Sequence, residues 1–301
     1  MSNNTKLKYI DNSNEWINWI EESNVVNELL HVEMSQVIQN FSRINIKEIE
    51  PSISLENYYS VLINKIILLL ENTNIMMGKY KIGNYLNNHN IDIQEINNWI
   101  LNNQDNSNSV FLLGVFNHLG IEVSVNKKKA FELYQKAANL ENIHAINGLG
   151  YCYTYGTGVS IDKLKAFKLY QKIANLGNAS AMFHLGNCYK DGFGVYIDKQ
   201  KAFELYQQSA NLGNTLGMAH LANCYNGGFV VNVDKQKAFE LHWKAANLGN
   251  YLAQYNLASM YINGNVVTKD IDQAIYWYKK SAEQGFKKAQ SKVNDLINLK
   301  F

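Results

Sequence analysis

A block of 16 residues recurs at a constant interval along the second half of this chain. The three most similar copies begin at Asp162, Asp198 and Asp234, and each opens with Asp-Lys-x-Lys-Ala-Phe-x-Leu and closes with Ala-Asn-Leu-Gly. Looser copies begin at Asn126 and Asp270, so successive copies are 36 residues apart without slippage. A fixed period of this size predicts stacked units that bury their apolar faces only against their neighbours.

Each unit reads as two helices joined by a tight turn. In the unit around 181–213, Ala181, Leu185 and Gly186 share one helical face, and the glycines of 191–195 allow a turn with positive φ. Asp198 is placed to cap a second helix, which Gly213 closes after its last turn. The predicted buried stripe of that helix consists of Ala202, Phe203, Leu205, Tyr206 and Ala210.

These residues resemble the Sel-one-like repeat, a relative of the tetratricopeptide repeat. The resemblance covers five copies from residue 109 to near 299, and it implies an all-α, right-handed α/α superhelical solenoid. The segment from Phe286 to Leu299 is then a sixth first helix that caps the array. Several positions depart from the pattern, and these are Asn117, Glu122, Glu141, Ala222, Val230, Ala258 and Val266.

Residues 1–105 do not share the period, so we expect an N-terminal helical segment there and the solenoid at 106–301. Apolar spacing predicts short helices near 16–20 and 33–41, and Ser54 is placed to cap a longer one at 55–71. Two more are expected near 79–87 and 93–101. The polar run 102–108 marks the boundary, and the chain before about residue 30 is expected to be partly disordered.

A second resemblance concerns this N-terminal segment. Residues 14–22 look like the leader that precedes a kinase domain in multi-domain proteins of soil symbiotic fungi. Residues 38–51 and 93–103 look like the bridge between such kinases and these repeats. The chain carries none of the kinase motifs, namely Gly-x-Gly-x-x-Gly, Val-Ala-x-Lys, His-Arg-Asp and Asp-Phe-Gly. The resemblance therefore implies a version of such a protein without its kinase domain.

Charge and cysteine usage restrict the class of partner and the compartment. The net charge is +2 with 18% charged residues, which gives no electrostatic case for nucleic acid or an anionic membrane surface. The most apolar run, 61–70, is too short to span a membrane, and no signal-peptide pattern opens the chain.

The three cysteines Cys152, Cys188 and Cys224 are also 36 residues apart. In a stack of repeats this spacing places their sulfur atoms too far apart for a disulfide or a shared zinc ion. We therefore expect a cytoplasmic protein with reduced thiols.

No catalytic set is found in the sequence. The histidines of the repeats (His144, His184, His220 and His242) lack co-ligands for a metal, and no serine or cysteine has a base at fixed spacing. We expect no metal and no cofactor. The tyrosines at 153, 189, 225 and 261 are predicted to belong to the core.

The remaining candidate is a surface. By resemblance, first helices line the concave side of the solenoid, where the positions opposite the buried face carry amide, imidazole and phenol groups that both donate and accept hydrogen bonds. Such a groove suits an extended peptide or a partner helix, although plain solvated positions without a ligand are an open alternative. The predicted partner-binding residues are Tyr151, Tyr155, His184, Asn187, Asp191, His220, Asn223, Asn256, Ser259 and Asn263.

These features and resemblances leave three functions to consider. The first is a non-enzymatic scaffold or adaptor that binds a protein or peptide in this groove. The second is a kinase-less regulatory form of a signalling protein, which would need the N-terminal segment. The third is a hydrolase, as assigned to some bacterial members of the resembling family, which would need a nucleophile beside a base. The identity of the partner and the oligomeric state are left open.

Overall fold

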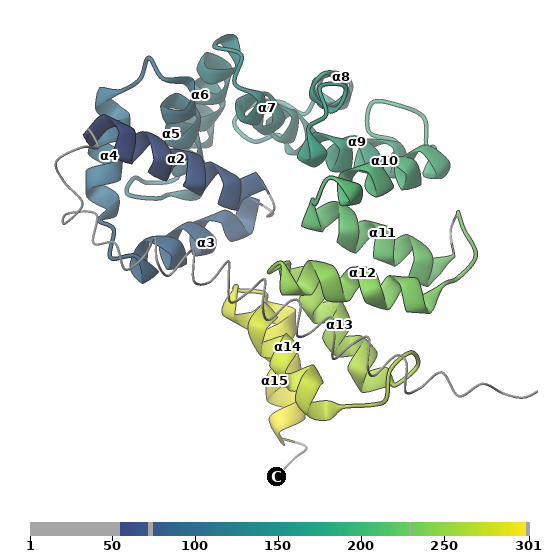
Figure 1. Cartoon of the computed structure of the whole chain (residues 1–301). Helices are drawn as coiled ribbons and strands as arrows, with labels where there is room; N and C mark the ends of the chain where they lie inside the picture. The colour runs from purple at the N-terminus through teal and green to yellow at the C-terminus, as the bar shows by residue number, and fades with distance from the viewer. Residues whose placement is uncertain (1–54, 72–74, 229, 299–301) are drawn as a thin grey trace, which may run out of the picture. The chain divides into compact units, whose positions relative to one another are not determined.

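The computed structural model describes residues 55–71, 75–228 and 230–298. All of the described residues except Leu55 belong to one compact unit, 56–301. The helices predicted near 16–20 and 33–41, the Ser54 cap and the disorder predicted before residue 30 therefore lie outside the described residues. The described part holds 14 helices and no strand (Figure 1), which confirms the all-α prediction.

The repeats follow three helices that do not share the period. These three are α2 (Leu55–Glu71), α3 (Ile75–Asn88) and α4 (Ile93–Asn102). The first helices of the five repeats are α5 (Ser107–Leu119), α7 (Ile143–Tyr155), α9 (Ala179–Asp191), α11 (Thr215–Gly227) and α13 (Tyr251–Asn263). The second helices are α6 (Lys127–Asn139), α8 (Lys163–Ala174), α10 (Lys199–Asn211), α12 (Lys235–Asn247) and α14 (Ile271–Glu283), and α15 (Lys287–Asn298) follows the last of them.

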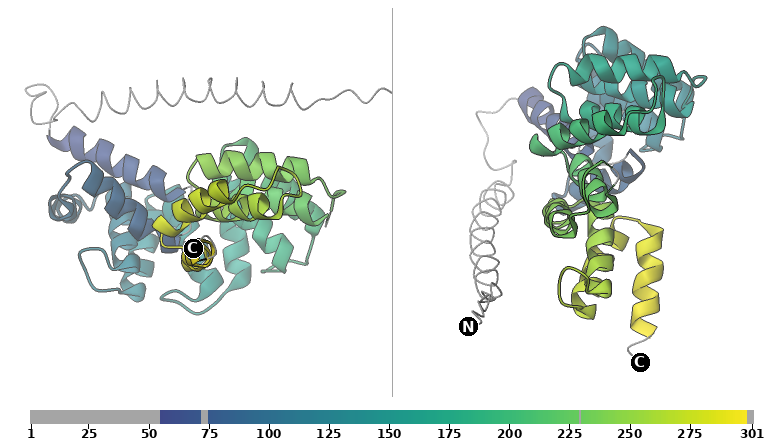
Figure 2. Two further views of the ribbon diagram at one scale, coloured as in Figure 1. Left: turned by 90° about the horizontal axis from the view of Figure 1, so that it is seen from below. Right: turned by 90° about the vertical axis from the view of Figure 1, so that its right-hand side faces the viewer.

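Side-chain caps define where the repeat helices begin. Every second helix starts after the residue predicted to cap it; Asp198 Oδ1, for example, accepts a hydrogen bond from the Lys201 amide at 2.9 Å. First helices are capped in the same way by an asparagine and end on a glycine with positive φ, such as Gly192 at φ 71°. Consecutive helices from α5 to α15 pack against each other (Figure 2), so the stack is built from nearest-neighbour contacts.

Some predicted helix limits shift. Helix α3 begins at Ile75 and not near residue 79. Its Gly78 lies close to α2, since a Cβ there would be 2.8 Å from Leu70 Cδ2. Helix α5 begins at Ser107, two residues before the predicted start, because Asn106 supplies the cap. Of the polar run 102–108, only residues 103–106 connect α4 to α5, because Asn102 ends α4 and residues 107–108 begin α5. Side chains of α2–α4 share one hydrophobic core with the first repeats.

A buried tyrosine from each of the first three second helices fills the space beside a glycine of the preceding first helix. Tyr134, Tyr170 and Tyr206 are almost fully buried. A Cβ at Gly186 would lie 2.7 Å from Tyr206 Cε1, so the glycine is required for this close approach. In the fourth repeat the equivalent pair is Ala222 and His242, where a smaller ring accompanies the added methyl group, whereas the fifth repeat pairs Ala258 with Tyr278.

The first-helix tyrosines at 153, 189, 225 and 261, which the sequence predicted to be core, differ in burial. Tyr153 and Tyr225 are buried, whereas Tyr189 and Tyr261 are only partly buried. Each packs edge-on against a phenylalanine of the preceding second helix. These pairs are Phe131–Tyr153, Phe167–Tyr189, Phe203–Tyr225 and Phe239–Tyr261, with ring centroids 5.5 to 5.9 Å apart.

The glycine–tyrosine packing gives a testable stability effect. We expect Gly186→Ala to lower the free energy of unfolding by about 2 kcal/mol, because the new methyl group overlaps the buried Tyr206 ring. Adding Tyr206→His should cost less than the sum of the two single changes, since it copies the fourth repeat. Urea denaturation measures all three variants. Gly83→Ala is the control, because its Cβ would meet nothing within 4 Å; strictly additive losses would contradict the account.

Candidate functional site

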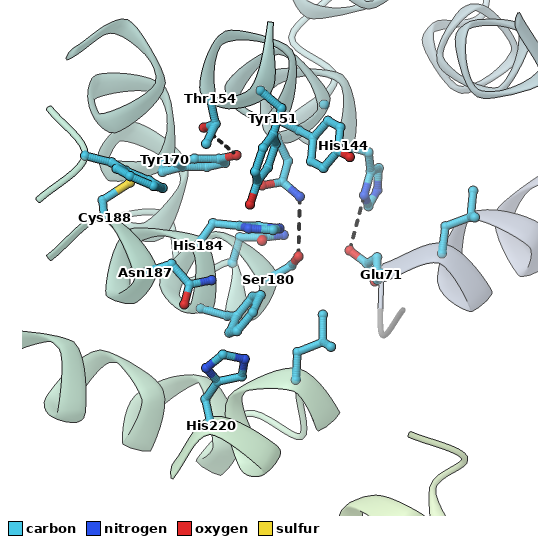
Figure 3. Close-up of a pocket in the computed structure, with 18 of the residues that line it drawn as sticks. Glu71, His144, Tyr151, Thr154, Tyr170, Ser180, His184, Asn187, Cys188 and His220 are labelled. Atoms are coloured by element: carbon cyan, nitrogen blue, oxygen red, sulfur yellow. Dashed lines mark hydrogen bonds and ion pairs between the residues drawn. The ribbon is translucent and has the colours of Figure 1, made fainter. Parts of the chain in front are cut away.

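A cavity of about 330 Å³ opens between the first helices of successive repeats. Side chains of α5, α7, α9 and α11 line it, together with the C-terminal end of α2 (Figure 3). Six of the ten predicted binding residues line this cavity, namely Tyr151, Tyr155, His184, Asn187, Asp191 and His220. The structure therefore brings together residues that lie up to two repeats apart in the sequence.

The other four predicted residues do not line the cavity. Asn256 donates a hydrogen bond to Asn223 Oδ1 at 3.4 Å, and Ser259 Oγ lies 2.8 Å from the Tyr278 hydroxyl. Asn263 is exposed at the end of α13. In the last two repeats these polar groups thus contact one another and a second-helix tyrosine. A shared sequence position did not place them in one site.

The two cavity histidines are packed among aromatic rings. His184 stacks on Tyr170 with ring centroids 5.0 Å apart, and His220 lies edge-on to Phe183 at 4.9 Å. Sequence position alone put them opposite the buried face; the structure buries most of each, because the second-helix tyrosines reach under them. Burial lowers the pKa of both imidazoles to about 4, with neighbouring Lys190, His184 and His242 adding to the shift at His220. At neutral pH both rings are uncharged, and each can donate one hydrogen bond and accept another.

Phenol, amide and carboxylate groups complete the wall on α7 and α9. The rings of Tyr151 and Tyr155 lie 4.6 Å apart, and Tyr155 is 59% exposed. Asn187 Oδ1 accepts a hydrogen bond from the Tyr206 hydroxyl at 2.7 Å, which fixes the orientation of its amide. Asp191 forms an ion pair with Lys190 at 3.4 Å, so this end of the cavity carries no net charge from the pair.

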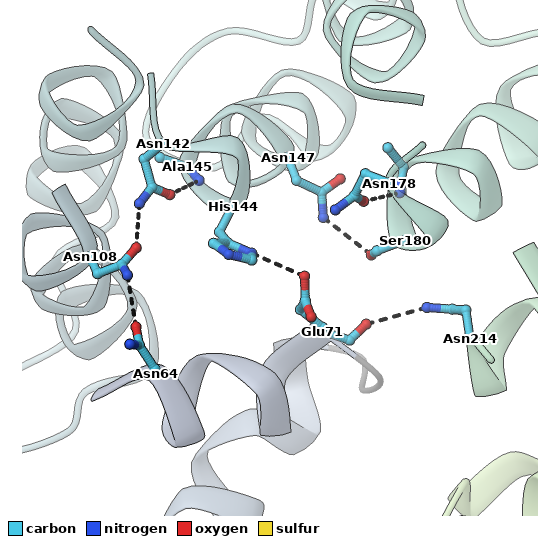
Figure 4. A network of polar contacts seen from close by, with 11 residues as sticks. Asn64, Glu71, Asn108, Asn142, His144, Ala145, Asn147, Asn178, Ser180 and Asn214 are labelled. Carbon is cyan, nitrogen blue, oxygen red and sulfur yellow. Dashed lines mark hydrogen bonds and ion pairs between the residues drawn. The ribbon is translucent and has the colours of Figure 1, made fainter. Parts of the chain in front are cut away.

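One wall of the cavity was not predicted. The end of α2 contributes Ile67, Leu70 and Glu71, and Glu71 Oε1 lies 3.2 Å from His144 Nδ1 (Figure 4). The Glu71 carbonyl also accepts a hydrogen bond from Asn214 Nδ2 at 3.4 Å. This last contact joins residues 143 positions apart, in elements with different periodicity, so no sequence pattern indicates it.

Asn147 is a second cavity residue that the prediction missed. Its Nδ2 donates a hydrogen bond to Ser180 Oγ at 3.3 Å, whereas its Oδ1 is buried without a partner. A signal was present in the sequence, because the equivalent positions of the first, third and fifth repeats carry the aromatic residues Phe111, Phe183 and Tyr255. The second repeat places a short polar side chain where those repeats place a ring.

The chemistry available in the cavity is hydrogen bonding and ring contact. Cys188 lines it, but burial, followed by the nearby Asp191 charge, raises the pKa of its thiol to about 12, so the thiol is protonated and a weak nucleophile. The three cysteines at 152, 188 and 224 are free, and Cys224 is only partly buried.

Among the described residues, no group of three potential metal ligands is found. None of the described helices has the length and hydropathy needed to cross a membrane.

Comparison with known proteins places the chain. The Sel1 repeat model matches residues 107–142, 143–178, 179–214, 215–250 and 252–286, which together exceed half of the chain. A Sel1 repeat protein from Oxalobacter formigenes shows 30% identity and a TM-score of 0.54, covering 63% of this chain and 76% of that one. A protective antigen of uropathogenic Escherichia coli strains shows 30% identity and a TM-score of 0.49, covering 79% of this chain and 51% of that one.

Among curated proteins, none matches the chain. The five consecutive matches coincide with the five helix pairs from α5 to α14. The chain therefore belongs to the Sel1 repeat family.

Proposed function

We propose that this protein is a non-enzymatic scaffold or adaptor that binds an extended segment of a partner protein in the cavity between its first helices. The observation that carries the proposal is the convergence of six hydrogen-bonding or aromatic side chains on one cavity of about 330 Å³. That volume lies in the range of ligand sites. Sel1 repeat proteins generally act as protein-interaction scaffolds, which supports the same assignment.

The cavity chemistry favours binding over hydrolysis. A cysteine nucleophile needs a lowered thiol pKa, yet burial raises the pKa of Cys152 and of Cys188 to about 12. The His184 imidazole, four residues before Cys188, has a pKa of about 4 and is a poor general base at neutral pH. Three free cysteines suit a reducing compartment, and we place the protein in the cytoplasm on that ground.

The test uses the two exposed members of the site, since replacing His184 or His220 would also disturb ring packing. We expect the double variant Tyr155→Ala with Asp191→Ala to bind the partner at least about tenfold more weakly, because tyrosines at the centre of an interface contribute strongly to affinity. The partner is first captured from source cells on the chain of residues 1–301 and identified by mass spectrometry. Affinity is then measured with the purified partner.

The matched control is Asn263→Ala with Gln207→Ala, two exposed residues outside the cavity. It should bind like the unmodified chain. Equal affinities for the groove variant and the control would refute the proposed site. If removal of residues 1–54 abolished binding while the groove variant had no effect, the kinase-related regulatory function would be favoured instead.

A further inference from the structure

A glycine inside α7 has no steric reason to be a glycine. A Cβ at Gly148 would meet Tyr134 at 3.4 Å, which is an ordinary van der Waals contact, and the backbone there is regular helix. Two residues further on, a Cβ at Gly150 would lie 2.5 Å from Tyr170 Cε1. Gly150 is therefore required by packing, whereas Gly148 weakens the helix without relieving any overlap.

The other repeats show what Gly148 leaves open. Equivalent positions carry Leu112, His184, His220 and Asn256, so only the second repeat lacks a side chain here. The neighbouring position is reduced as well, since Asn147 stands where Phe111 and Phe183 stand. Gly148 and Asn147 both line the cavity of about 330 Å³. Compared with the third repeat, the second repeat therefore has asparagine in place of phenylalanine and glycine in place of histidine at the point where the cavity lies.

The surroundings of this opening select the chemistry of an occupant. Rings of Tyr134, Tyr151, Phe183 and His184 line it, which favours a flat aromatic group. The buried Asn147 Oδ1 has no partner and needs a hydrogen-bond donor. The two carboxylates already have partners, since Glu71 Oε1 lies 3.2 Å from the His144 imidazole and Asp191 forms an ion pair with Lys190 at 3.4 Å. Among the described residues that line the cavity, no unmatched cation is left to hold a phosphate or a carboxylate.

We infer that the Asn147–Gly148 opening is a pocket for a tyrosine or tryptophan side chain of the bound partner, whose O–H or N–H donates to Asn147 Oδ1 once the Asn147 side chain turns towards the opening, since this oxygen is enclosed in the structure. This inference rests on the proposed binding function and names the anchor residue of its ligand. A phenylalanine would supply the ring but leave Asn147 unpaired, which disfavours it.

The experiment measures binding of N-acetyl-tyrosinamide, N-acetyl-tryptophanamide and N-acetyl-phenylalaninamide to the full chain by NMR titration. We expect the first two to bind with a Kd on the order of 1 mM, as suits ligands of this size. The phenylalanine amide should bind about fivefold more weakly, as expected for one lost hydrogen bond. Asn147→Leu should remove this difference between the tyrosine and phenylalanine amides.

Filling the pocket supplies the second test. Gly148→His and Gly148→Leu, which copy the third and first repeats, should weaken binding of the tyrosine amide by more than about tenfold, as expected when a bulky side chain occupies a pocket. Gly148→Ala should raise the urea midpoint, which shows that the position tolerates side chains. Gly83→His, at an open helix glycine outside the cavity, is the matched control and should bind normally.

The inference is overturned if no amide binds the unmodified chain, if Gly148→His binds the amides as well as the unmodified chain does, or if the phenylalanine amide binds as tightly as the tyrosine amide. These results are separate from the test of the proposed function. A captured partner that binds Gly148→His normally but loses affinity for Tyr155→Ala with Asp191→Ala would leave the groove assignment standing and remove the aromatic anchor. If the amides bound but no partner could be captured, the aromatic pocket would stand and the proposed partner-binding function would be left without support.

Discussion

Replacing Gly194 by alanine should lower the free energy of unfolding by about 3 kcal/mol or more, among the largest effects of any single methyl group in the repeats. Gly194 has φ 73°, a conformation that alanine adopts only with strain. Its added Cβ would also overlap the Lys163 carbonyl oxygen and lie 2.7 Å from the Lys163 carbonyl carbon. These are backbone atoms at the start of α8, so the overlap is relieved only by displacing a helix of the preceding repeat.

Gly213 separates the two causes of this loss. It has φ 86°, but a Cβ there would meet nothing within 4 Å. Gly213→Ala should therefore show only the backbone strain, about 1 kcal/mol. Glu141 already occupies the equivalent position of the first repeat with φ 60°, which shows that a side chain is tolerated there. Urea denaturation of both variants checks the prediction, and equal losses at the two glycines would contradict it.

Acidification from pH 7 to pH 5 should destabilise the fold by several kcal/mol. Burial lowers the pKa of His118, His184, His220 and His242 to about 4, against an ordinary value of 6.5, with the Lys127 charge adding to the shift at His118. Between these two values the unfolded chain binds more protons than the folded chain. The stabilising effect is therefore complete above pH 6.5 and is lost as the pH falls from 6.5 towards 4.

The magnitude is large because four sites titrate together. Each neutral buried imidazole contributes about 1 to 2 kcal/mol to the difference between pH 7 and pH 5. The sum is comparable with the total stability of an ordinary domain, so unfolding is expected near pH 5. Measuring the urea midpoint at several pH values tests this, and a midpoint that stays constant from pH 7 to pH 5 would contradict it.

A single histidine variant assigns the effect to these side chains. His242 is 2% exposed and stands where other repeats place a buried tyrosine. His242→Gln should reduce the stability difference between pH 7 and pH 5 by about 1 to 2 kcal/mol, even if it lowers stability at both. His89→Gln, at an exposed position after α3, is the control for the substitution itself.

The sequence by itself determined the repeat architecture. The 36-residue period, the capping residue before each second helix and the closing glycines predicted the helix pairs, because these signals act within one turn of the helix they define. Asp198 and Gly213 hold the roles predicted for them. Six of the predicted binding residues line one cavity, because positions one repeat apart on stacked first helices share a face.

Only the tertiary structure decided which elements form the walls of that cavity and which positions in it lack a bulky side chain. The end of α2 packs against His144 and Asn214 through contacts between segments of different period, which no local pattern encodes. Whether a glycine is required by packing also depends on its neighbours in space: a Cβ at Gly150 would lie 2.5 Å from the buried Tyr170 ring, whereas a Cβ at Gly148 would make only ordinary contacts. Likewise the sequence put His184 on the solvent side, and the Tyr170 ring beneath it decided its burial and its low pKa.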